Sequence, residues 1–157
     1  TGVKMLNEHF RTTDDFFRNV NFDQDMFSVL KERYSGDRRA FFTSGPGSRE
    51  FRERIDLFDF KSFDEAYHQL MSELTDLTIE SIRLILPQND DTENMYITGG
   101  FAKNSIFLKL MARAFPQKKV YTSVINDASA LGAALTIINS VTDQQVEPEL
   151  GLTECEV

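Results

Sequence analysis

The sequence is poor in residues that could cross-link it or hold a metal. Of its 157 residues, only one is a cysteine and two are histidines. The single cysteine, Cys155, excludes an intrachain disulfide, and no His-x-x-x-His or Cys-x-x-Cys spacing points to a metal site. His9 and His68 are solitary, and we expect His68 to be an exposed or partly packed residue rather than a ligand. The sequence therefore predicts no metal-binding residues.

Positive charge and long apolar runs are also scarce. Lysine and arginine together number 17 against 25 aspartates and glutamates, which gives a net charge of −8. Nucleic-acid binding relies on clustered basic residues, and no apolar run approaches the roughly 20 residues of a membrane span. Residues 1–20 also lack the apolar stretch of a signal peptide. We therefore expect a cytoplasmic protein with no nucleic-acid or membrane partner.

Apolar and aromatic residues are plentiful enough for a sizeable core, at 41% and 11% of the chain. The pattern divides the chain into three parts. Residues 1–60 form a poorly defined N-terminal part, in which Asp23 caps a helix that closes at Gly36 and residues 40–43 resemble a short strand before a turn at 44–48. Residues 61–141 form the core of the domain. Residues 142–157 form an acidic tail that we expect to be loosely held.

The clearest helix of the sequence begins at Ser62. Ser62 and Glu65 have the spacing of a capping box, and apolar residues then recur at steps of three and four. We predict a helix of about 24 residues that runs to Pro87, since proline disfavours its continuation.

Strands and helices alternate in the rest of the core. Residues 95–98 read as a buried strand, Gly99 and Gly100 as a turn, and Asn104 as the cap of a helix that carries residues 106–114. A second short strand at 120–122 leads into a helix over 128–139. This order predicts an α/β layer with parallel strand pairing.

The best candidate site is the stretch from Ile97 to Asn104, where a strand runs through two glycines into a helix. Glycines let a flat or anionic ligand approach the backbone, and free amides at a helix start attract negative charge. A plain strand-to-helix turn explains the same spacing. Neither a Gly-x-Gly-x-x-Gly fingerprint nor a Gly-Lys-Ser/Thr string is present, so the pattern supports neither a Rossmann site nor a P-loop.

The helix over residues 128–135 consists mostly of small residues, in the order Ala-Ser-Ala-Leu-Gly-Ala-Ala-Leu. Small side chains permit close backbone approach. We expect this helix to lie tightly on a sheet or on a neighbouring helix.

The order and spacing of these two segments resemble the C-terminal part of the FGGY carbohydrate kinases. The family's signature is similar: Gly-Gly, a small residue, Asn, a helix, a short strand, and then an acidic residue with Ala-Leu-Gly-Ala-Ala. The close match covers residues 95–138. The resemblance implies an actin-like ATPase lobe of the ribonuclease H kind, with a mixed sheet and flanking helices.

The same resemblance implies a nucleotide site. Gly99 and Gly100 would approach the adenosine and Asn104 would contact the adenine, while the helix over 128–134 would support the pocket from behind. Phe101 departs from the family pattern, which has a small residue there, so its ring would stack on the base or crowd it.

The family's catalytic segments, of the Gly-Asp-Gln and Gly-Thr-Gly types, do not occur in this sequence. The chain also begins with Thr1 in what reads as the middle of a longer protein. We therefore assign no catalytic residue and expect an isolated, inactive ATP-binding lobe. Its partners would be an N-terminal kinase lobe, ATP with Mg²⁺, a small sugar or polyol and, through surplus phenylalanines, a second subunit in a homodimer.

Two alternatives stay open. The chain could be a noncatalytic actin-like interaction or regulatory domain, which the missing catalytic segments favour. It could also be another actin-like ATPase, such as an activator of acyl-CoA dehydratases. Those activators resemble iron-sulfur proteins with several cysteines, so the single cysteine of this chain counts against them.

Overall fold

The computed structural model describes residues 2–34, 38–43, 50–87, 89–123, 125, 128–141 and 149–155. The α-helices are α1 (Gly2–Phe10), α2 (Gln24–Arg33), α3 (Phe63–Ile85), α4 (Ser105–Ala114) and α5 (Ala128–Val141). Short 3-10 helices form η1 (Phe16–Asn19), η2 (Leu57–Asp59) and η3 (Gly99–Lys103). The strands are β1 (Asn94–Ile97), β2 (Lys119–Ser123) and β3 (Leu152–Glu154).

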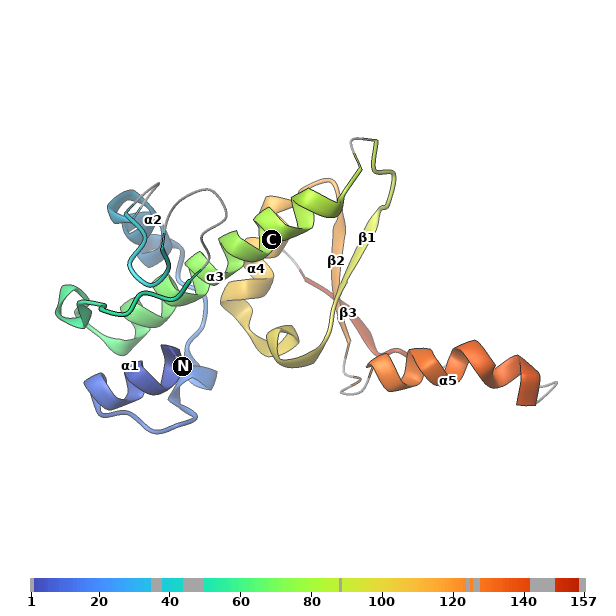
Figure 1. Ribbon diagram of the computed structural model, residues 1–157, viewed down its shortest axis with the longest axis horizontal. Helices are drawn as coiled ribbons and strands as arrows, with labels where there is room; N and C mark the ends of the chain where they lie inside the picture. Colours follow the sequence, from blue (N-terminus) through green and yellow to red (C-terminus); the bar gives the residue numbers. More distant parts are fainter. Residues whose placement is uncertain are drawn as a thin grey trace.

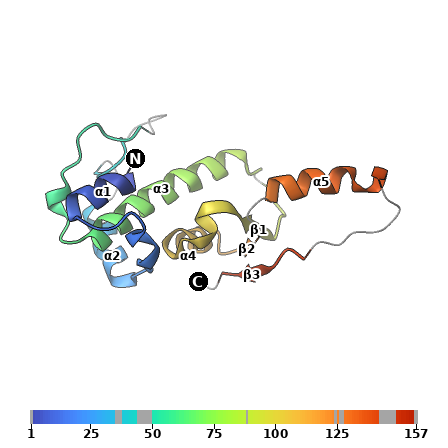
Figure 2. The ribbon, with the colours of Figure 1, turned by 90° about the horizontal axis from the view of Figure 1, so that it is seen from below.

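The long helix α3 runs through the middle of the molecule and joins its two ends (Figure 1). Helices α1 and α2 pack on its first half, whereas α4 lies along it on the side of the sheet. Helix α5 extends outward beyond the sheet (Figure 2). None of the described helices combines the length and apolar character needed to cross a membrane.

The predicted helix starts are confirmed by their capping bonds. Ser62 accepts a hydrogen bond from the backbone N–H of Glu65 at 3.2 Å, and Asp23 accepts one from Met26 at 2.9 Å. Each bond satisfies an amide that has no partner within its own helix. Helix α3 ends at Ile85, two residues before Pro87. The end predicted for the second helix, Gly36, lies outside the described residues.

The strands form one mixed sheet in the order β1, β2, β3. β1 and β2 pair in parallel with Met95 opposite Val120, which confirms the predicted α/β class and parallel pairing. β2 and β3 are antiparallel, with Thr122 opposite Thr153. The prediction of a loosely held tail is therefore wrong for residues 152–155, because these residues bond to β2 and Cys155 donates its backbone N–H to the Val120 carbonyl at 2.8 Å.

The buried core lies around α3, between α4 on one side and described parts of the poorly patterned residues 1–60 on the other. Phe41 is fully buried and stacks on Phe60 at 5.6 Å between ring centroids, and Phe63 stacks on Tyr67 at 5.7 Å. The predicted strand at 40–43 is reduced to a single antiparallel bridge between Phe42 and Phe51. The turn predicted at 44–48 lies outside the described residues.

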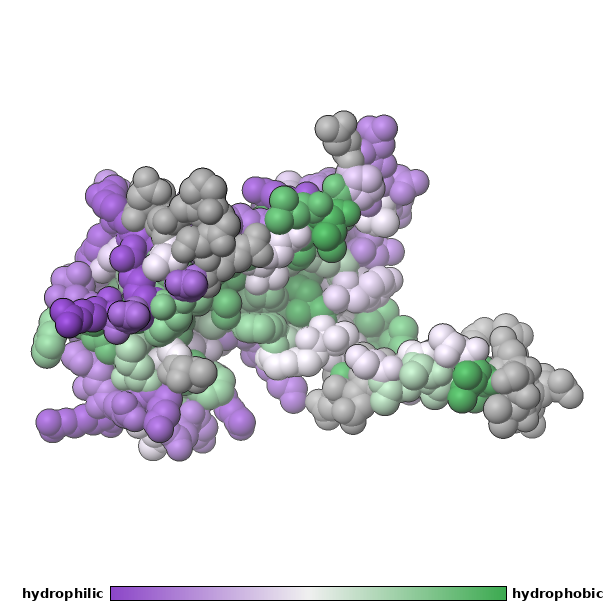
Figure 3. Space-filling view, viewed as in Figure 1, coloured by the Kyte–Doolittle hydropathy of each residue, from purple (hydrophilic) through white to green (hydrophobic). Residues whose placement is uncertain are grey.

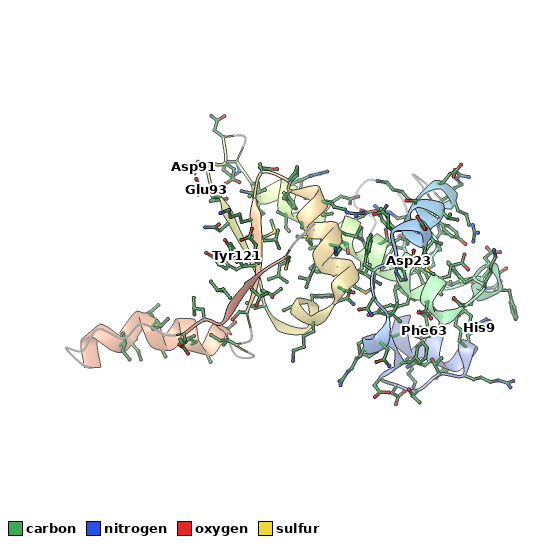
Figure 4. The ribbon with its side chains drawn as sticks, turned by 180° about the vertical axis from the view of Figure 1, so that it is seen from behind. His9, Asp23, Phe63, Asp91, Glu93 and Tyr121 are labelled. Carbon is green, nitrogen blue, oxygen red and sulfur yellow. The ribbon has the colours of Figure 1, made fainter. Side chains whose placement is uncertain are left out.

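Two buried polar residues of α3 hold the flanking segments. The Glu73 carboxylate accepts backbone N–H groups from Ala40, Phe41 and Phe42 at 2.6–3.0 Å. His68 is 2% exposed, so the expectation of an exposed or partly packed histidine is wrong. Its Nε2 accepts the backbone N–H of Asp23, which Figure 4 shows at the start of α2, and its Nδ1 faces the Asp64 carbonyl at 2.8 Å.

Helix α5 does not pack closely on the sheet, contrary to the expectation from its small residues. A Cβ atom added at Gly132 would meet no heavy atom within 4 Å, and Ile137 is 60% exposed. The 14 residues of α5 include no charged side chain, and this helix appears white to green in Figure 3. Small residues permit close packing but do not supply a surface to pack against. In the described chain, no element covers the face of α5 that points away from the sheet.

Candidate functional site

The glycine pair follows β1 and forms the first turn of η3. Gly99 has a φ of +75°, a conformation that residues with a Cβ adopt at a cost of about 1–2 kcal/mol. Gly100 has no such requirement, and a Cβ added there would point into open space. Gly99 is therefore needed for the turn, whereas Gly100 leaves room on the surface that the turn presents.

Asn104 ends η3 and starts α4. Its Oδ1 accepts the backbone N–H of Phe107 at 2.9 Å, which confirms the predicted cap. Its Nδ2 donates to the hydroxyl of Tyr67 on α3 at 2.7 Å. Asn104 thus fixes the glycine turn against the central helix.

Tyr67 itself is almost fully buried. Burial raises the pKa of its phenol, and the hydrogen bond from Asn104 opposes that shift. In this hydrogen bond the hydroxyl oxygen accepts, so Asn104 does not use the hydroxyl hydrogen.

An apolar cleft opens beside this turn, which we call the aromatic cleft. It has a volume of about 480 Å³. Side chains of α1, η1, α3 and the bridge at Phe42 form its walls, together with the end of the glycine turn. The lining residues are Gly2, Val3, Phe17, Phe42, Phe51, Tyr67, Leu70, Met71, Leu74, Gly100, Phe101 and Asn104.

A second, more polar cleft adjoins the first, which we call the cationic cleft. It has a volume of about 560 Å³. Its lining residues are Phe17, Arg18, Val20, Asn21, Gly100, Lys103, Asn104 and Ser105. Phe17, Gly100 and Asn104 belong to both clefts, so the two clefts adjoin at the glycine turn.

The structure brings together three of the four predicted site residues. Gly100, Phe101 and Asn104 line the aromatic cleft, whereas Gly99 acts through the shape of the turn. The Phe101 ring stacks on Phe107 at 4.6 Å and is 43% exposed. Its position next to Gly100 makes it part of the cleft wall.

Sequence reasoning missed the residues that η1 and α3 contribute. Phe17, Arg18 and Tyr67 lie far from the glycine turn in sequence, and only the packing of η1 and α3 against it brings them there. Lys103 lies within the candidate stretch itself. Its positive charge beside the glycines was the one signal in the sequence that could have indicated a basic residue at the site.

Neither cleft offers ligands for a divalent cation. Mg²⁺ prefers carboxylate oxygens and water, and the linings of both clefts contain no aspartate or glutamate. Among the described residues, no group of three or more histidine, cysteine or acidic side chains could hold a metal ion. Asp91 and Glu93 lie at the end of the sheet away from α5, before β1 (Figure 4). The residues present do not fit a bound Mg²⁺ at this site.

Together these observations describe a glycine turn that opens onto an aromatic cleft and an adjoining cationic cleft. Comparison with known proteins found no matching family model, no similar curated protein and no similar solved structure.

Proposed function

We propose that this chain is the C-terminal, ATP-binding lobe of a sugar kinase of the FGGY type, with an actin-like fold. One observation carries the proposal: Gly100, Phe101 and Asn104 lie together on the wall of an aromatic cleft. The sequence resemblance assigns Gly100 to the adenosine and Asn104 to the adenine, and it makes Phe101 a departure from the family pattern that would stack on the base or crowd it. The local order of β1, glycine turn, α4, parallel β2 and α5 also agrees with that resemblance.

The aromatic cleft has the chemistry to hold a purine. Sites for flat ligands are mostly apolar, with a few polar groups that fix orientation. Here Phe17, Phe101 and Tyr67 supply rings, and the Tyr67 hydroxyl and Asn104 amide supply polar atoms at one end. The missing side chain at Gly100 leaves space for the base.

The chain provides the binding half of the proposed reaction and not its catalytic half. Phosphoryl transfer needs an oriented sugar hydroxyl, a base and a metal ion at the phosphates. With no carboxylate along either cleft, the described residues supply neither the base nor the metal ligands. In the proposal, an N-terminal lobe brings these groups and the sugar or polyol, and both act in the cytoplasm.

A titration with adenosine and ATP, followed by amide chemical shifts, tests the proposal. For adenosine we expect a dissociation constant on the order of 1 mM, because half a cleft keeps only about 4 kcal/mol of binding. The largest shifts should fall on residues 99–104 and on Tyr67.

Gly100→Val is the sharpest variant. A Cβ added at Gly100 meets no heavy atom within 4 Å, and the backbone there is not in the left-handed region, so we expect an intact fold. Because Gly100 lines the aromatic cleft, the added side chain should narrow it and weaken adenosine binding at least about tenfold. Gly132→Ala on α5 is the matched control, because Gly132 also faces open space but lies outside both clefts. Equal binding by parent and Gly100→Val would reject the aromatic cleft as the adenine site.

The exposed, uncharged helix α5 favours the second candidate, a noncatalytic interaction domain. Helices that are apolar on all sides are normally buried, and α5 is exposed at most of its described positions. Absence of any adenosine or ATP shift at 10 mM, about ten times the expected constant, would leave this candidate as the better one.

A further inference from the structure

The cationic cleft has an unusual charge for this chain. Two of its lining side chains, Arg18 and Lys103, are basic and none is acidic, although acidic residues outnumber basic ones by 25 to 17. Clefts lined by one sign of charge focus the electrostatic field and attract ions of the opposite sign. The cleft therefore favours an anion.

Neither basic side chain is neutralised by the described part of the protein. Elsewhere the basic groups of Arg33, Arg39 and Lys118 form ion pairs with Glu65, Glu80 and Asp90. Within the described residues, Arg18 and Lys103 form no ion pair, and the Arg18 guanidinium lies 5.9 Å from the centre of the Phe17 ring. No described carboxylate therefore competes with a ligand for either charge.

The backbone at the cleft adds to the positive potential. The first residue of α4, Ser105, lines the cleft beside its cap, Asn104. The amide groups at the start of a helix carry partial positive charge and bind anions. This effect supports the two side chains and would not by itself define a site.

The cationic cleft also adjoins the aromatic cleft. Phe17, Gly100 and Asn104 line both, so the two clefts meet at these three residues. A molecule with a flat apolar end and a multiply charged anionic end matches this pair of surfaces.

We propose that the cationic cleft is a polyphosphate-binding site in which Arg18 and Lys103 hold the phosphates of a nucleotide whose base lies in the aromatic cleft. This inference rests on the proposed function for the position of the base. It adds two positioning residues from different parts of the chain, one on η1 and one on η3. Charge-assisted hydrogen bonds to phosphate oxygens would hold the chain of phosphates.

Three probes separate the two clefts. Inorganic tripolyphosphate, adenosine and ATP are titrated separately into the same chain, with amide shifts as the readout. We expect tripolyphosphate to shift residues 18 and 103–106, adenosine to shift residues near Tyr67, and ATP to shift both sets. ATP should bind at least about tenfold more tightly than adenosine, with an advantage that falls as salt rises.

Single substitutions identify the groups responsible. Lys103→Ala and Arg18→Ala should each remove most of the advantage of ATP over adenosine, while adenosine binding is unchanged. Arg18→Lys should restore part of it, because it keeps the charge. Lys109→Ala is the matched control, since Lys109 lies on α4 but not in the cleft lining.

The outcomes distinguish this inference from the proposed function. If adenosine binds but ATP gains nothing and tripolyphosphate causes no shifts, the polyphosphate site is wrong and the adenine cleft stands. If tripolyphosphate binds and Lys103→Ala abolishes it while adenosine causes no shifts, the anion site stands and the assignment of the base is wrong. Equal weakening by Lys109→Ala would reduce the effect to net charge and overturn the inference.

Discussion

The two ends of this molecule are stabilised to very different degrees. The helical half, made of α1, α2, α3 and the short helices η1 and η2, buries stacked phenylalanines and ties its loops to α3 through Glu73 and His68. The sheet half, made of β1 to β3 and α5, has short strands, and every residue of β3 is exposed. The contrast is visible in Figure 1, where α5 lies well away from the packed helices.

The difference in burial shows in which half the described chain covers its own apolar side chains. Phe41 and Leu6 are completely buried in the helical half, whereas Tyr96 and Ile137 in the sheet half are more than half exposed. An apolar helix gains stability mainly from the surface it packs against. Most of the folding free energy should therefore come from the helical half, and the candidate clefts lie at its junction with β1.

The largest test of this contrast compares one buried with one exposed apolar side chain. Phe41→Ala should lower the free energy of unfolding by about 3–5 kcal/mol, because it empties a site at the centre of stacked rings. Ile137→Ala on α5 should change it by less than about 0.5 kcal/mol. Urea unfolding followed by far-UV circular dichroism measures both. Similar losses would mean that α5 is packed in solution.

A smaller effect is expected from the buried carboxylate of Glu73. Glu73→Ala would leave the amides of residues 40–42 and the Gln69 side chain without their acceptor. We expect a loss of about 3 kcal/mol, since each buried unsatisfied donor is costly. Glu80→Ala, which breaks the partly exposed ion pair with Arg39 on the same helix, should cost less than about 1 kcal/mol. Equal losses of unfolding free energy for Glu73→Ala and Glu80→Ala in the same assay would show that the hydrogen bonds of Glu73 to residues 40–42 do not stabilise the fold as proposed.

The smallest effect concerns acid sensitivity in the sheet half. Hydrogen bonds from Lys118 and Thr92 hold the pKa of Asp90 below its ordinary value. A lowered pKa means that the folded state binds the proton less readily than the unfolded state, so this stabilisation is present above the ordinary pKa of aspartate. It should disappear as the pH falls through the lowered value.

Asp90→Asn checks this sign. The difference in unfolding free energy between parent and variant should be constant near neutral pH and should shrink in acid, below about pH 4. Asp91→Asn, one residue along the same loop but outside the Lys118 contacts, is the control variant. A difference that grows on acidification would contradict the assigned direction.

Local signals in the sequence predicted the middle of the fold well. Ser62 and Asn104 were identified as caps because a cap depends on residues only a few positions away. Strand β3 was missed because it is held by pairing with β2, which leaves no local pattern in its sequence. Helix α1 was missed although Val3, Leu6 and Phe10 recur at helical spacing and pack in or against the core.

The candidate site likewise combines residues that the sequence predicts with residues that only long-range packing brings together. The glycine turn was predicted from its spacing and the binding role of Asn104 from the family resemblance; Gly100 and Asn104 lie on a cleft wall, whereas Gly99 shapes the turn. Phe17, Arg18 and Tyr67 reach the site only through the packing of η1 and α3 around the turn. The close packing expected for α5 was wrong, since residue size indicates what a surface permits and not what covers it.

Lys118 has a consequence for chemical reactivity. Its ammonium group has three hydrogens to donate, and the structure places acceptors for all of them: Asp90 Oδ2, the Thr92 carbonyl and the Thr92 hydroxyl. An acylating reagent needs a free amine, so it can reach Lys118 only when the loop before β1 opens. The rate at which Lys118 is labelled, relative to an exposed lysine such as Lys4, therefore reports how often that loop leaves the sheet.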